Sequence, residues 1–207
     1  RATVKLLNFS RLNKIKRVVF ASSAAVYGDE LSLPKNELSD VQPISPYGYE
    51  KLMSENYLDL YSQLYGLETI KLRYFNVYGI GQTGSYAGVI TKFLENIKNQ
   101  KPFIINGNGD QIRDFIHVTD IAQVNLIAMK SKISNGFFNI GTGIPTSINE
   151  LAKKMIKLSN HNQKIIHGPE LEGDVEISQA DMSSTKKLLD WNYEINLLEG
   201  LKDLIQK

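Results

Sequence analysis

Segments with helical periodicity alternate with short β-branched and aromatic runs along the whole chain, and this alternation restricts the fold more than any other feature. Helical patterns cover residues 1–15, 46–65, 86–99, 119–130, 148–158, 184–191 and 197–206. Runs with strand character occupy residues 17–22, 67–78, 102–107, 136–141 and 164–168. Continuous apolar strands that follow helices are typical of a parallel sheet covered on both faces. We therefore predict an α/β protein with a Rossmann-type, doubly wound parallel sheet, and a less regular layer formed by the last third of the chain.

The composition is that of a globular chain, and it excludes several functions. The 24 basic and 22 acidic side chains are interspersed and give a net charge of +2, whereas a nucleic-acid-binding protein concentrates basic residues on one face. We therefore expect no nucleic-acid partner. The chain has no cysteine, which excludes disulfides and thiolate metal sites and fits a reducing cytoplasm. No apolar run approaches the ~18 residues that span a bilayer, so we expect a cytoplasmic protein without a membrane segment.

A serine pair and a tyrosine–lysine pair form the sharpest candidate site. Ser22 and Ser23 end the first predicted strand, and Tyr47 and Lys51 lie in the first turns of the next predicted helix. Positions four apart on a helix share a face, so the Lys51 ammonium can lie beside the Tyr47 phenol and lower its pKa from about 10 toward neutrality. Tyr47 would then act as acid and base, and the Ser23 hydroxyl would complete a proton relay to a substrate alcohol. The same spacing also fits the edge of an ordinary amphipathic helix.

The order of the surrounding motifs distinguishes between these two interpretations. The segments KRVVFASSAAVYG, SPYGYEKLMSE, LRYFNVYG, RDFIHVTDIA and FNIGTG follow one another along the chain. In this order they resemble the extended short-chain dehydrogenases/reductases, in particular the nucleotide-sugar epimerases and dehydratases. The resemblance implies that Tyr47 is the catalytic base, that Lys51 tunes it and binds the nicotinamide ribose, and that Ser23 assists. It also implies NAD as the cofactor, with Ser22 and Tyr74 near it.

Two alanines after the serine pair narrow the reaction that the resemblance implies. In the related dehydratases and decarboxylases an acidic side chain follows the catalytic hydroxyl, whereas Ala24 and Ala25 follow it here, and a methyl group cannot transfer protons. We therefore predict 4-epimerisation of a nucleotide sugar, in which the alcohol is oxidised, the ketone rotates and the hydride returns to its other face. A 4,6-dehydratase, a 4-keto-sugar reductase and a non-catalytic NAD(P)-binding relative are the alternatives.

Several residues match positions that bind the nucleotide sugar in this family. Arg113 matches the arginine that clamps the diphosphate, a task suited to a planar cationic fork. A surface ion pair with a neighbouring aspartate is the other interpretation of this arginine. Asn76 matches an asparagine that contacts the substrate. Val89 and the strand around Ile105 match segments that contact the base, largely through the main chain.

The identity of the sugar depends on four further positions. Asp174 matches the acidic residue of the family's Arg-x-Gly-Asp segment, but Leu171 stands where its arginine should be, so one phosphate contact is missing. Ser178 stands where galactose-restricted epimerases carry a bulky tyrosine, and Gly88 replaces a common asparagine. Both small residues leave room for an acetamido group. The resemblance thus favours UDP-GlcNAc and UDP-GalNAc over UDP-Glc and UDP-Gal, although Ser178 also fits an ordinary loop serine.

Two other patterns carry less weight. Residues 79–84 (GIGQTG) fit the dinucleotide-binding fingerprint, but the acidic residue expected ~20 residues later is absent. We interpret them as a flexible loop over the sugar site. His117, His161 and His167 show no metal-ligand spacing, so we expect no metal.

The resemblance also predicts how the chain is divided and what it lacks. It assigns residues 1–78, rejoined by about 112–142, to the C-terminal half of an NAD-binding Rossmann domain, and residues 79–111 and 143–207 to the nucleotide-sugar-binding region. The family's glycine fingerprint precedes the start of this chain, so we expect roughly 100 residues of the fold to be absent and the 207 residues alone to be inactive. The first two predicted helices commonly form the dimer bundle in such proteins, so we also expect a homodimer.

Overall fold

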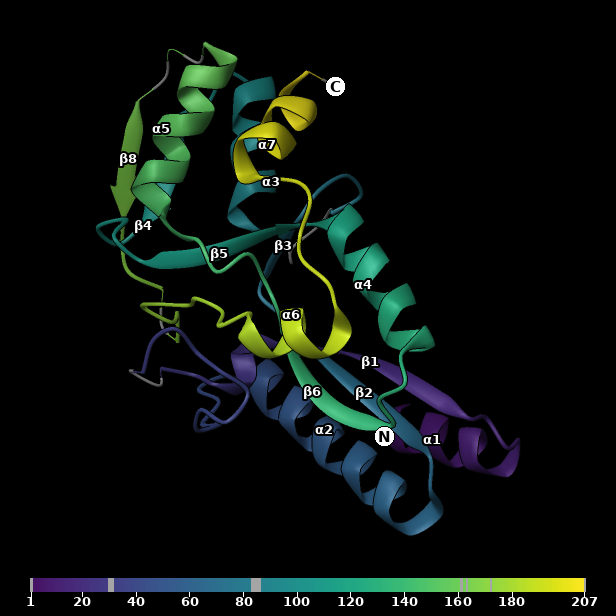
Figure 1. The fold of residues 1–207 in the computed structure, drawn as a ribbon. Helices are drawn as coiled ribbons and strands as arrows, with labels where there is room; N and C mark the ends of the chain where they lie inside the picture. Colours follow the sequence, from purple (N-terminus) through teal and green to yellow (C-terminus); the bar gives the residue numbers. More distant parts are fainter. Residues whose placement is uncertain are drawn as a thin grey trace.

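A parallel three-stranded sheet is the centre of one of the two layers of the fold. In the computed structural model the described residues are 2–29, 32–82, 87–160, 162, 164–171 and 173–206. The strands lie in the order β1-β2-β6 (Figure 1), with bounds β1 (Arg17–Ser23), β2 (Glu68–Tyr74) and β6 (Asn135–Ile140). All three run in the same direction, so their carboxyl ends meet at one edge of the sheet.

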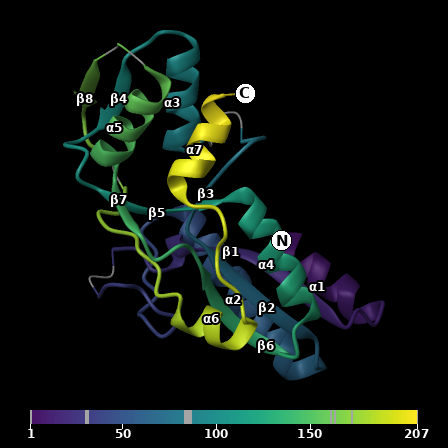
Figure 2. The ribbon, with the colours of Figure 1, turned by 45° about the horizontal axis from the view of Figure 1, so that its top comes forward.

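Helices cover both faces of this sheet. Two lie against one face, α1 (Ala2–Leu12) and α2 (Pro46–Tyr65), and two against the other, α4 (Val118–Lys130) and α6 (Ser183–Leu189) (Figures 1 and 2). Val18 and Phe20 pack toward α1 and α2, whereas Ile70 and Leu72 belong to the core on the α4 side. The predicted α/β class with a parallel sheet covered on both faces is therefore confirmed.

Local signals set both ends of α2, the helix that carries the tyrosine–lysine pair. The Ser45 side chain caps its first turn by accepting a hydrogen bond from the Gly48 N–H at 3.1 Å, and Pro46 occupies a first-turn position where no backbone N–H is needed. Gly66 ends the helix in the left-handed region, at φ 67°. These signals account for a helix whose bounds agree with the prediction.

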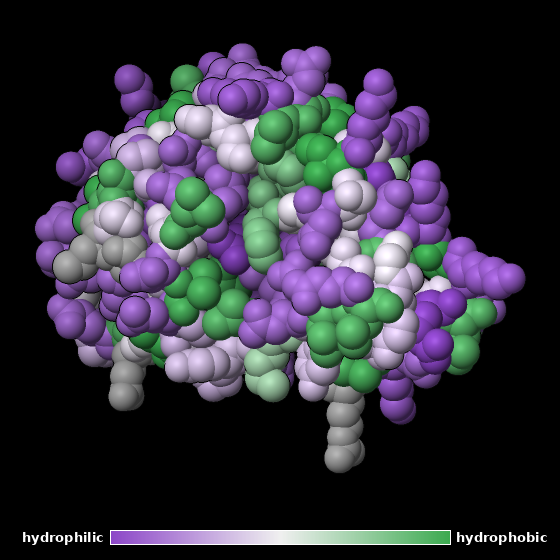
Figure 3. All heavy atoms as spheres, turned by 60° about the horizontal axis from the view of Figure 1, so that its bottom comes forward, coloured by the Kyte–Doolittle hydropathy of each residue, from purple (hydrophilic) through white to green (hydrophobic). Residues whose placement is uncertain are grey.

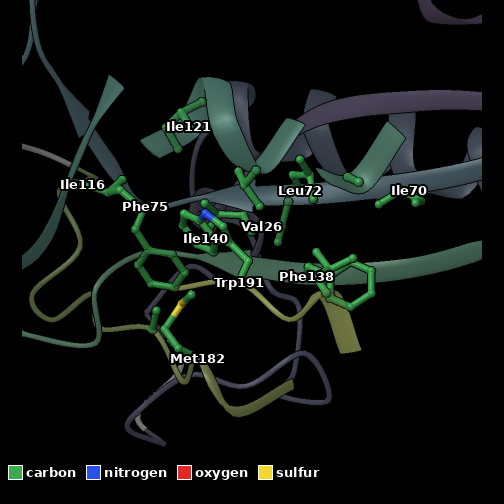
Figure 4. Close-up of a cluster of buried hydrophobic side chains, with 14 of the residues drawn as sticks. Val26, Ile70, Leu72, Phe75, Ile116, Ile121, Phe138, Ile140, Met182 and Trp191 are labelled. Carbon is green, nitrogen blue, oxygen red and sulfur yellow. The ribbon is translucent and has the colours of Figure 1, made fainter. Parts of the chain in front are cut away.

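The larger core lies between the sheet and α4, and the C-terminal segment closes it. Ile140 and Phe138 of β6 pack there with Met182 and Trp191, which reach back to the sheet from the last third of the chain (Figure 4). All four side chains are buried. Segments far apart in the sequence thus share one core. This shared core holds the segment after Gly173 in place at the carboxyl edge of the sheet.

A second, less regular layer lies beside the first sheet (Figure 2). It contains the sheet β3-β5-β7, the parallel pair β4-β8 and three helices, with bounds β3 (Asn76–Tyr78), β5 (Ile112–His117), β7 (Pro145–Ser147), β4 (Phe103–Asn106), β8 (Ile165–Gly168), α3 (Val89–Lys98), α5 (Ile148–Ser159) and α7 (Leu197–Ile205). Phe93, Phe103 and Leu151 lie at the centre of its own apolar core, fully buried. A short 3₁₀ turn, Ala24–Val26, follows β1.

The structure corrects two expectations about strands. Residues 67–78 were expected to form one strand, but the run breaks at Phe75, whose side chain enters the larger core while β3 pairs with β5 in the second sheet. The central strand β5 was not predicted, because Arg113 and Asp114 interrupt its apolar pattern with charges that the fold buries. No helix within the described ranges is long and apolar enough to cross a membrane.

Candidate active site

A cavity of about 190 Å³ opens at the carboxyl ends of β1 and β2. Ser23 ends β1, Tyr74 ends β2, and the two residues are partners in the parallel ladder. Ligands of open α/β sheets bind outside the carboxyl ends of the strands. Six predicted site residues line this cavity, namely Ser23, Tyr74, Asn76, Arg113, Asp174 and Ser178. The structure therefore brings four separate stretches of the chain to one place.

Tyr47 and Lys51 do not line this cavity themselves. They lie on the first turns of α2, whose capping residue Ser45 does line it. The Lys51 Nζ atom donates a hydrogen bond to the Ala21 carbonyl oxygen at 2.7 Å and lies 5.5 Å from the centre of the Tyr47 ring. Burial lowers the pKa of Lys51, and the nearby Glu50 carboxylate opposes this in smaller measure. The Tyr47 side chain is 54% exposed, so the phenol stands open to a ligand while its lysine partner is held against the strand.

Gly48 sets how closely α2 approaches the turn after Ser23. A Cβ atom built at this glycine would lie 2.5 Å from the Ala25 carbonyl oxygen and 2.8 Å from the Pro43 side chain. Only a residue without a side chain allows this approach. Gly48 was not among the predicted site residues, although its position next to Tyr47 in the first helical turn was a usable signal.

The Ser23 hydroxyl is oriented by the turn that follows it. Its Oγ atom accepts a hydrogen bond from the Ala25 N–H at 3.2 Å, which leaves the O–H to donate toward the cavity. Ala24 and Ala25 also line the cavity, so its wall beside the serine is formed by methyl groups where the related dehydratases were expected to carry an acid.

Arg113 is buried and pairs across the cavity wall with Asp174. Its Nη2 atom lies 2.5 Å from the Asp174 Oδ1 atom, and its Nη1 atom donates to the Ile112 carbonyl oxygen at 2.8 Å. The alternative of a surface pair with Asp110 or Asp114 is wrong, because Arg113 is buried and its partner is Asp174, 61 residues away in the sequence. A fixed guanidinium at the rim of a polar cavity is suited to an anionic group.

Asp114 joins the second sheet to the loop after β6 and to the segment that follows Ser178. Its fully buried carboxylate accepts hydrogen bonds from the backbone N–H groups of Thr142, Gly143 and Ala180 at 2.7, 2.8 and 3.1 Å. Burial raises the pKa of Asp114, and these hydrogen bonds oppose that shift. Ala180 follows Ser178 closely, so Asp114 holds the segment that contributes Ser178 to the cavity wall. This role of Asp114 was not predicted.

A larger cavity of about 390 Å³ adjoins the first, and both are lined by Asp174 and Val175. Leu171, 61% exposed, lies on its wall and offers no charge. Two predicted base-contacting residues do not line either cavity with their side chains: Ile105 is buried in the second core, and Val89 packs against that core from the start of α3. Any contact by Ile105 would therefore come from its main chain, as the prediction stated.

Two predicted cofactor contacts have other partners in the structure. The Ser22 Oγ atom donates to the Glu55 carboxylate at 2.5 Å, on the face of β1 opposite Ser23, so only its main chain is available to a cofactor. The Tyr74 hydroxyl is hydrogen-bonded to the Asn125 side chain, and burial raises the pKa of Tyr74. Tyr74 keeps its place on the cavity wall.

The remaining sequence patterns do not line this cavity where the structure describes them. Residues 79–82 of the glycine-rich segment line a separate hollow with Val77 and Val118, and residues 83 and 84 lie outside the described residues. His117 accepts a hydrogen bond from the Thr119 N–H at the start of α4, while His161 lies outside the described residues. Among the residues that the structure describes, no His, Asp and Glu side chains are grouped as metal ligands.

The fold and the site together define a class. A parallel α/β sheet ends in a serine beside a helix that opens with tyrosine and lysine, and a polar cavity lies at the strand ends. This is the arrangement expected of a short-chain dehydrogenase/reductase. Comparison with protein families identifies the family within this class: residues 1–141 match the NAD dependent epimerase/dehydratase family. The chain belongs to this family.

The relatives agree with this assignment. A Methanocaldococcus jannaschii protein named "Putative UDP-glucose 4-epimerase" is 42% identical over 206 residues, which cover 98% of this chain and 66% of that protein. The UDP-N-acetylglucosamine 4-epimerase from Methanobrevibacter ruminantium, solved in complex with UDP-N-acetylmuramic acid, is similar at 34% identity with a TM-score of 0.94 over 99% of this chain and 66% of that one. The UDP-glucose 4-epimerase from Thermotoga maritima with UDP-glucose is also 34% identical, with a TM-score of 0.95, 99% coverage of this chain and 67% of that one. The chain thus spans about two thirds of the length of these relatives.

The hydrogen-bonding groups of Lys51 and Tyr47 fit one part of NAD, the cofactor in the family's name. An ammonium has three N–H donors, and within the described part of the chain Lys51 uses one of them, on the Ala21 carbonyl oxygen. The other donors and the exposed Tyr47 hydroxyl lie at the carboxyl end of β1, where ribose hydroxyls can accept and donate hydrogen bonds. These residues therefore suit the nicotinamide ribose of NAD.

Proposed function

We propose that the protein containing this chain is an NAD-dependent UDP-sugar 4-epimerase. The observation that carries the proposal is the composition of the cavity: a serine hydroxyl, an asparagine and a fixed arginine surround it, and the exposed Tyr47 phenol stands at its side. The serine hydroxyl suits a substrate alcohol, the asparagine suits a sugar, and the arginine suits a diphosphate. NAD, when bound, would accept a hydride from the sugar carbon and later return it.

The residues of this chain would move and hold the proton. Tyr47 would take the proton of the sugar 4-hydroxyl as the carbon–hydrogen bond breaks, which leaves a ketone at that carbon. The Ser23 O–H, set by the hydrogen bond that its Oγ accepts from Ala25, would donate to the same oxygen. The Lys51 ammonium is held at the Ala21 carbonyl oxygen, 5.5 Å from the centre of the Tyr47 ring. After the ketone rotates, the carbon–hydrogen bond would form again on its opposite face while Tyr47 returns the proton to the oxygen, and the opposite epimer forms.

The cavity wall supports epimerisation over the alternatives within the family. A dehydratase must remove a proton from the carbon next to the ketone and must deliver one to the leaving hydroxyl. The wall beside Ser23 offers the methyl groups of Ala24 and Ala25, which can do neither. A reductase would consume a reduced cofactor in each turnover, whereas an epimerase regenerates NAD within the cycle.

The finer proposal concerns the sugar, and we favour UDP-GlcNAc and UDP-GalNAc over UDP-Glc and UDP-Gal. Ser178 is a small side chain on the cavity wall and leaves room there for an acetamido group. Gly88 caps the start of α3, where a built Cβ atom would lie 3.3 Å from the end of the Gln82 side chain, and it does not line this cavity, so the preference rests on Ser178.

The test is an assay of the natural full-length protein with UDP-GlcNAc, UDP-Glc and UDP-GlcA in separate incubations, with the epimers resolved by chromatography. We expect interconversion without added reductant, fastest for UDP-GlcNAc. Tyr47→Phe should abolish turnover while Tm stays unchanged, because Tyr47 is 54% exposed and phenylalanine keeps its ring. Undiminished turnover by Tyr47→Phe, or stoichiometric consumption of NADH or NADPH, would refute the proposal.

Two further expectations remain proposals. We propose that residues 1–78 and about 112–142 serve the cofactor, and that residues 79–111 and 143–207 serve the nucleotide sugar. We also propose a homodimer formed through α1 and α2, which expose a row of large apolar side chains, namely Leu6, Phe9, Leu12, Met53, Leu60 and Leu64. Figure 3, which turns the lower side of Figure 1 forward, shows apolar patches set among hydrophilic side chains. Sedimentation of the full-length protein at a monomer mass would contradict the dimer.

A further inference from the structure

Four side chains spaced four residues apart form a polar stripe along α2: Tyr47, Lys51, Glu55 and Asp59. Residues at this spacing share one face of a helix. Tyr47 reaches out beside the cavity, and the other three contact the sheet. A helix face that packs against a sheet is usually apolar. A polar stripe in this position therefore indicates that these side chains do more than fill the space between helix and sheet.

Glu55 is the most constrained member of the stripe. Its carboxylate accepts a hydrogen bond from Ser22 Oγ at 2.5 Å and two from Arg73, from Nε at 3.0 Å and from Nη2 at 2.8 Å. Arg73 is itself held by the Tyr27 hydroxyl at 3.0 Å, which donates to Asn139 at 2.6 Å. Glu55 and Arg73 are buried, at 1% and 3% exposure. Because each oxygen has a directional partner, the pair fixes both the height and the rotation of α2 on the sheet.

The contacts converge on the end of β1. Residues 21, 22 and 23 are consecutive: the Ala21 carbonyl oxygen binds Lys51, the Ser22 hydroxyl binds Glu55, and Ser23 bears the hydroxyl on the cavity wall. Two neighbouring residues of one strand are thus bound to the helix that carries Tyr47, and the third belongs to the site. Any shift of α2 along β1 changes the position of the phenol relative to the serine.

We propose that Glu55, together with Ser22 and Arg73, is a positioning group that sets the placement of Tyr47 and Lys51 relative to Ser23. This inference rests on the proposed function and assigns Ser22 a role other than cofactor contact. The nucleotide-sugar side of the cavity is built by β3, β5 and the segment around Ser178, none of which belongs to α2. A misplaced α2 should therefore lower kcat and leave KM for the nucleotide sugar unchanged.

The next member of the stripe provides a matched control. Asp59 pairs with Lys71 Nζ at 2.5 Å, and Lys71 is fully buried, so this is also a helix-to-sheet ion pair with a buried cation. It lies one turn further along α2 and pairs with Lys71 of β2, whereas Glu55 accepts a hydrogen bond from Ser22 of β1. Asp59→Asn and Glu55→Gln each replace a paired carboxylate by an amide of nearly the same shape, and they differ in their distance from the site.

The experiment compares both variants in the natural full-length protein, with kcat and KM for the best UDP-sugar measured well below the lower of the two Tm values. We expect Glu55→Gln to lower kcat by about 100-fold, as for a displacement near 1 Å in an active site, with KM unchanged. Asp59→Asn should lower Tm and leave kcat unchanged. Equal losses of kcat in the two variants, or a Glu55→Gln effect confined to KM, would overturn the inference.

Two further measurements keep the inference testable in every outcome. If Glu55→Gln does not fold, Ser22→Ala removes a single hydrogen bond from the same carboxylate and should still lower kcat, whereas Ser22→Thr, which keeps the hydroxyl, should restore it. Amide hydrogen exchange needs no substrate: Glu55→Gln should speed exchange in residues 48–52 more than Asp59→Asn does, and equal exchange would count against the positioning role. If the wild-type protein turns over no UDP-sugar, the proposed function fails and hydrogen exchange still decides the inference about α2.

Discussion

Gly48→Ala tests whether the close approach of α2 to the turn after Ser23 matters. In an ordinary helix this substitution stabilises by up to about 1 kcal/mol. Here the new Cβ atom would lie 2.5 Å from the Ala25 carbonyl oxygen, and ordinary contact begins at 3.4 Å, so the first turn of α2 must move by the difference, 0.9 Å. Crowding of this kind costs about 1–3 kcal/mol. We expect a net loss of about 1–2 kcal/mol, seen as a Tm lower by about 2–8 °C.

The same displacement should have a larger effect on catalysis than on stability. Tyr47 precedes Gly48 in the chain, so a shift of the first turn moves the phenol, and a displacement near 1 Å lowers a rate by about 100-fold. Gly136→Ala is the control: its Cβ atom meets the Phe138 ring at 3.1 Å at the opposite end of the sheet from the cavity, so it should affect Tm without affecting kcat. A Gly48→Ala variant with an unchanged or higher Tm and wild-type kcat would refute the reasoning.

Three other predictions concern Arg113, Ser178 and Glu37. Arg113→Met should raise KM for the UDP-sugar by more than about 10-fold with a smaller effect on kcat, and Arg113→Lys should be intermediate, because an ammonium keeps the charge and loses the fork. Ser178→Tyr should lower kcat/KM for UDP-GlcNAc at least about 10-fold relative to UDP-Glc if the cavity holds the acetamido group beside Ser178, and equal losses would contradict this. Burial, and in smaller measure the Asp181 carboxylate, raises the pKa of Glu37 above its ordinary 4.5. The contribution of Glu37 to the free energy of unfolding is therefore greatest below pH 4.5, and it falls as pH rises from 4.5 toward the raised pKa. Urea unfolding from about pH 4 to about pH 7 should therefore show wild type losing stability relative to Glu37→Gln, and a constant difference would contradict the raised pKa.

Features set by neighbouring residues could be predicted from the sequence. The bounds of α2 depend on Ser45, Pro46 and Gly66, each of which acts on the nearest turn of helix. The pairing of Tyr47 with Lys51 depends on helical spacing, and the structure has the ammonium 5.5 Å from the ring. Such signals lie within a few residues of the feature that they determine, so the pattern alone was sufficient.

Features set by distant partners could not be predicted in this way. Ser22 and Ser23 look equivalent in the sequence, but the pleat sends them to opposite faces of β1, and Ser22 meets Glu55, 33 residues away. Arg113 meets Asp174, 61 residues away. The strand β5 was missed because a buried arginine and aspartate look like surface residues until their partners are known.

The two layers of the fold have separate tasks at the cavity, and this separation governs how mutations should act. The first layer supplies Ser23 from β1 and the Tyr47–Lys51 pair from α2, which are the proton-transfer groups that we propose. The second supplies Arg113 from β5 and holds Ser178 through Asp114, on the side proposed for the nucleotide sugar. Substitutions that displace α2 should therefore act on kcat, and those that loosen β5 should act on KM. The buried Asp114 carboxylate is the exception, because it joins β5 to the loop after β6 in the first sheet, so its replacement should change both constants together.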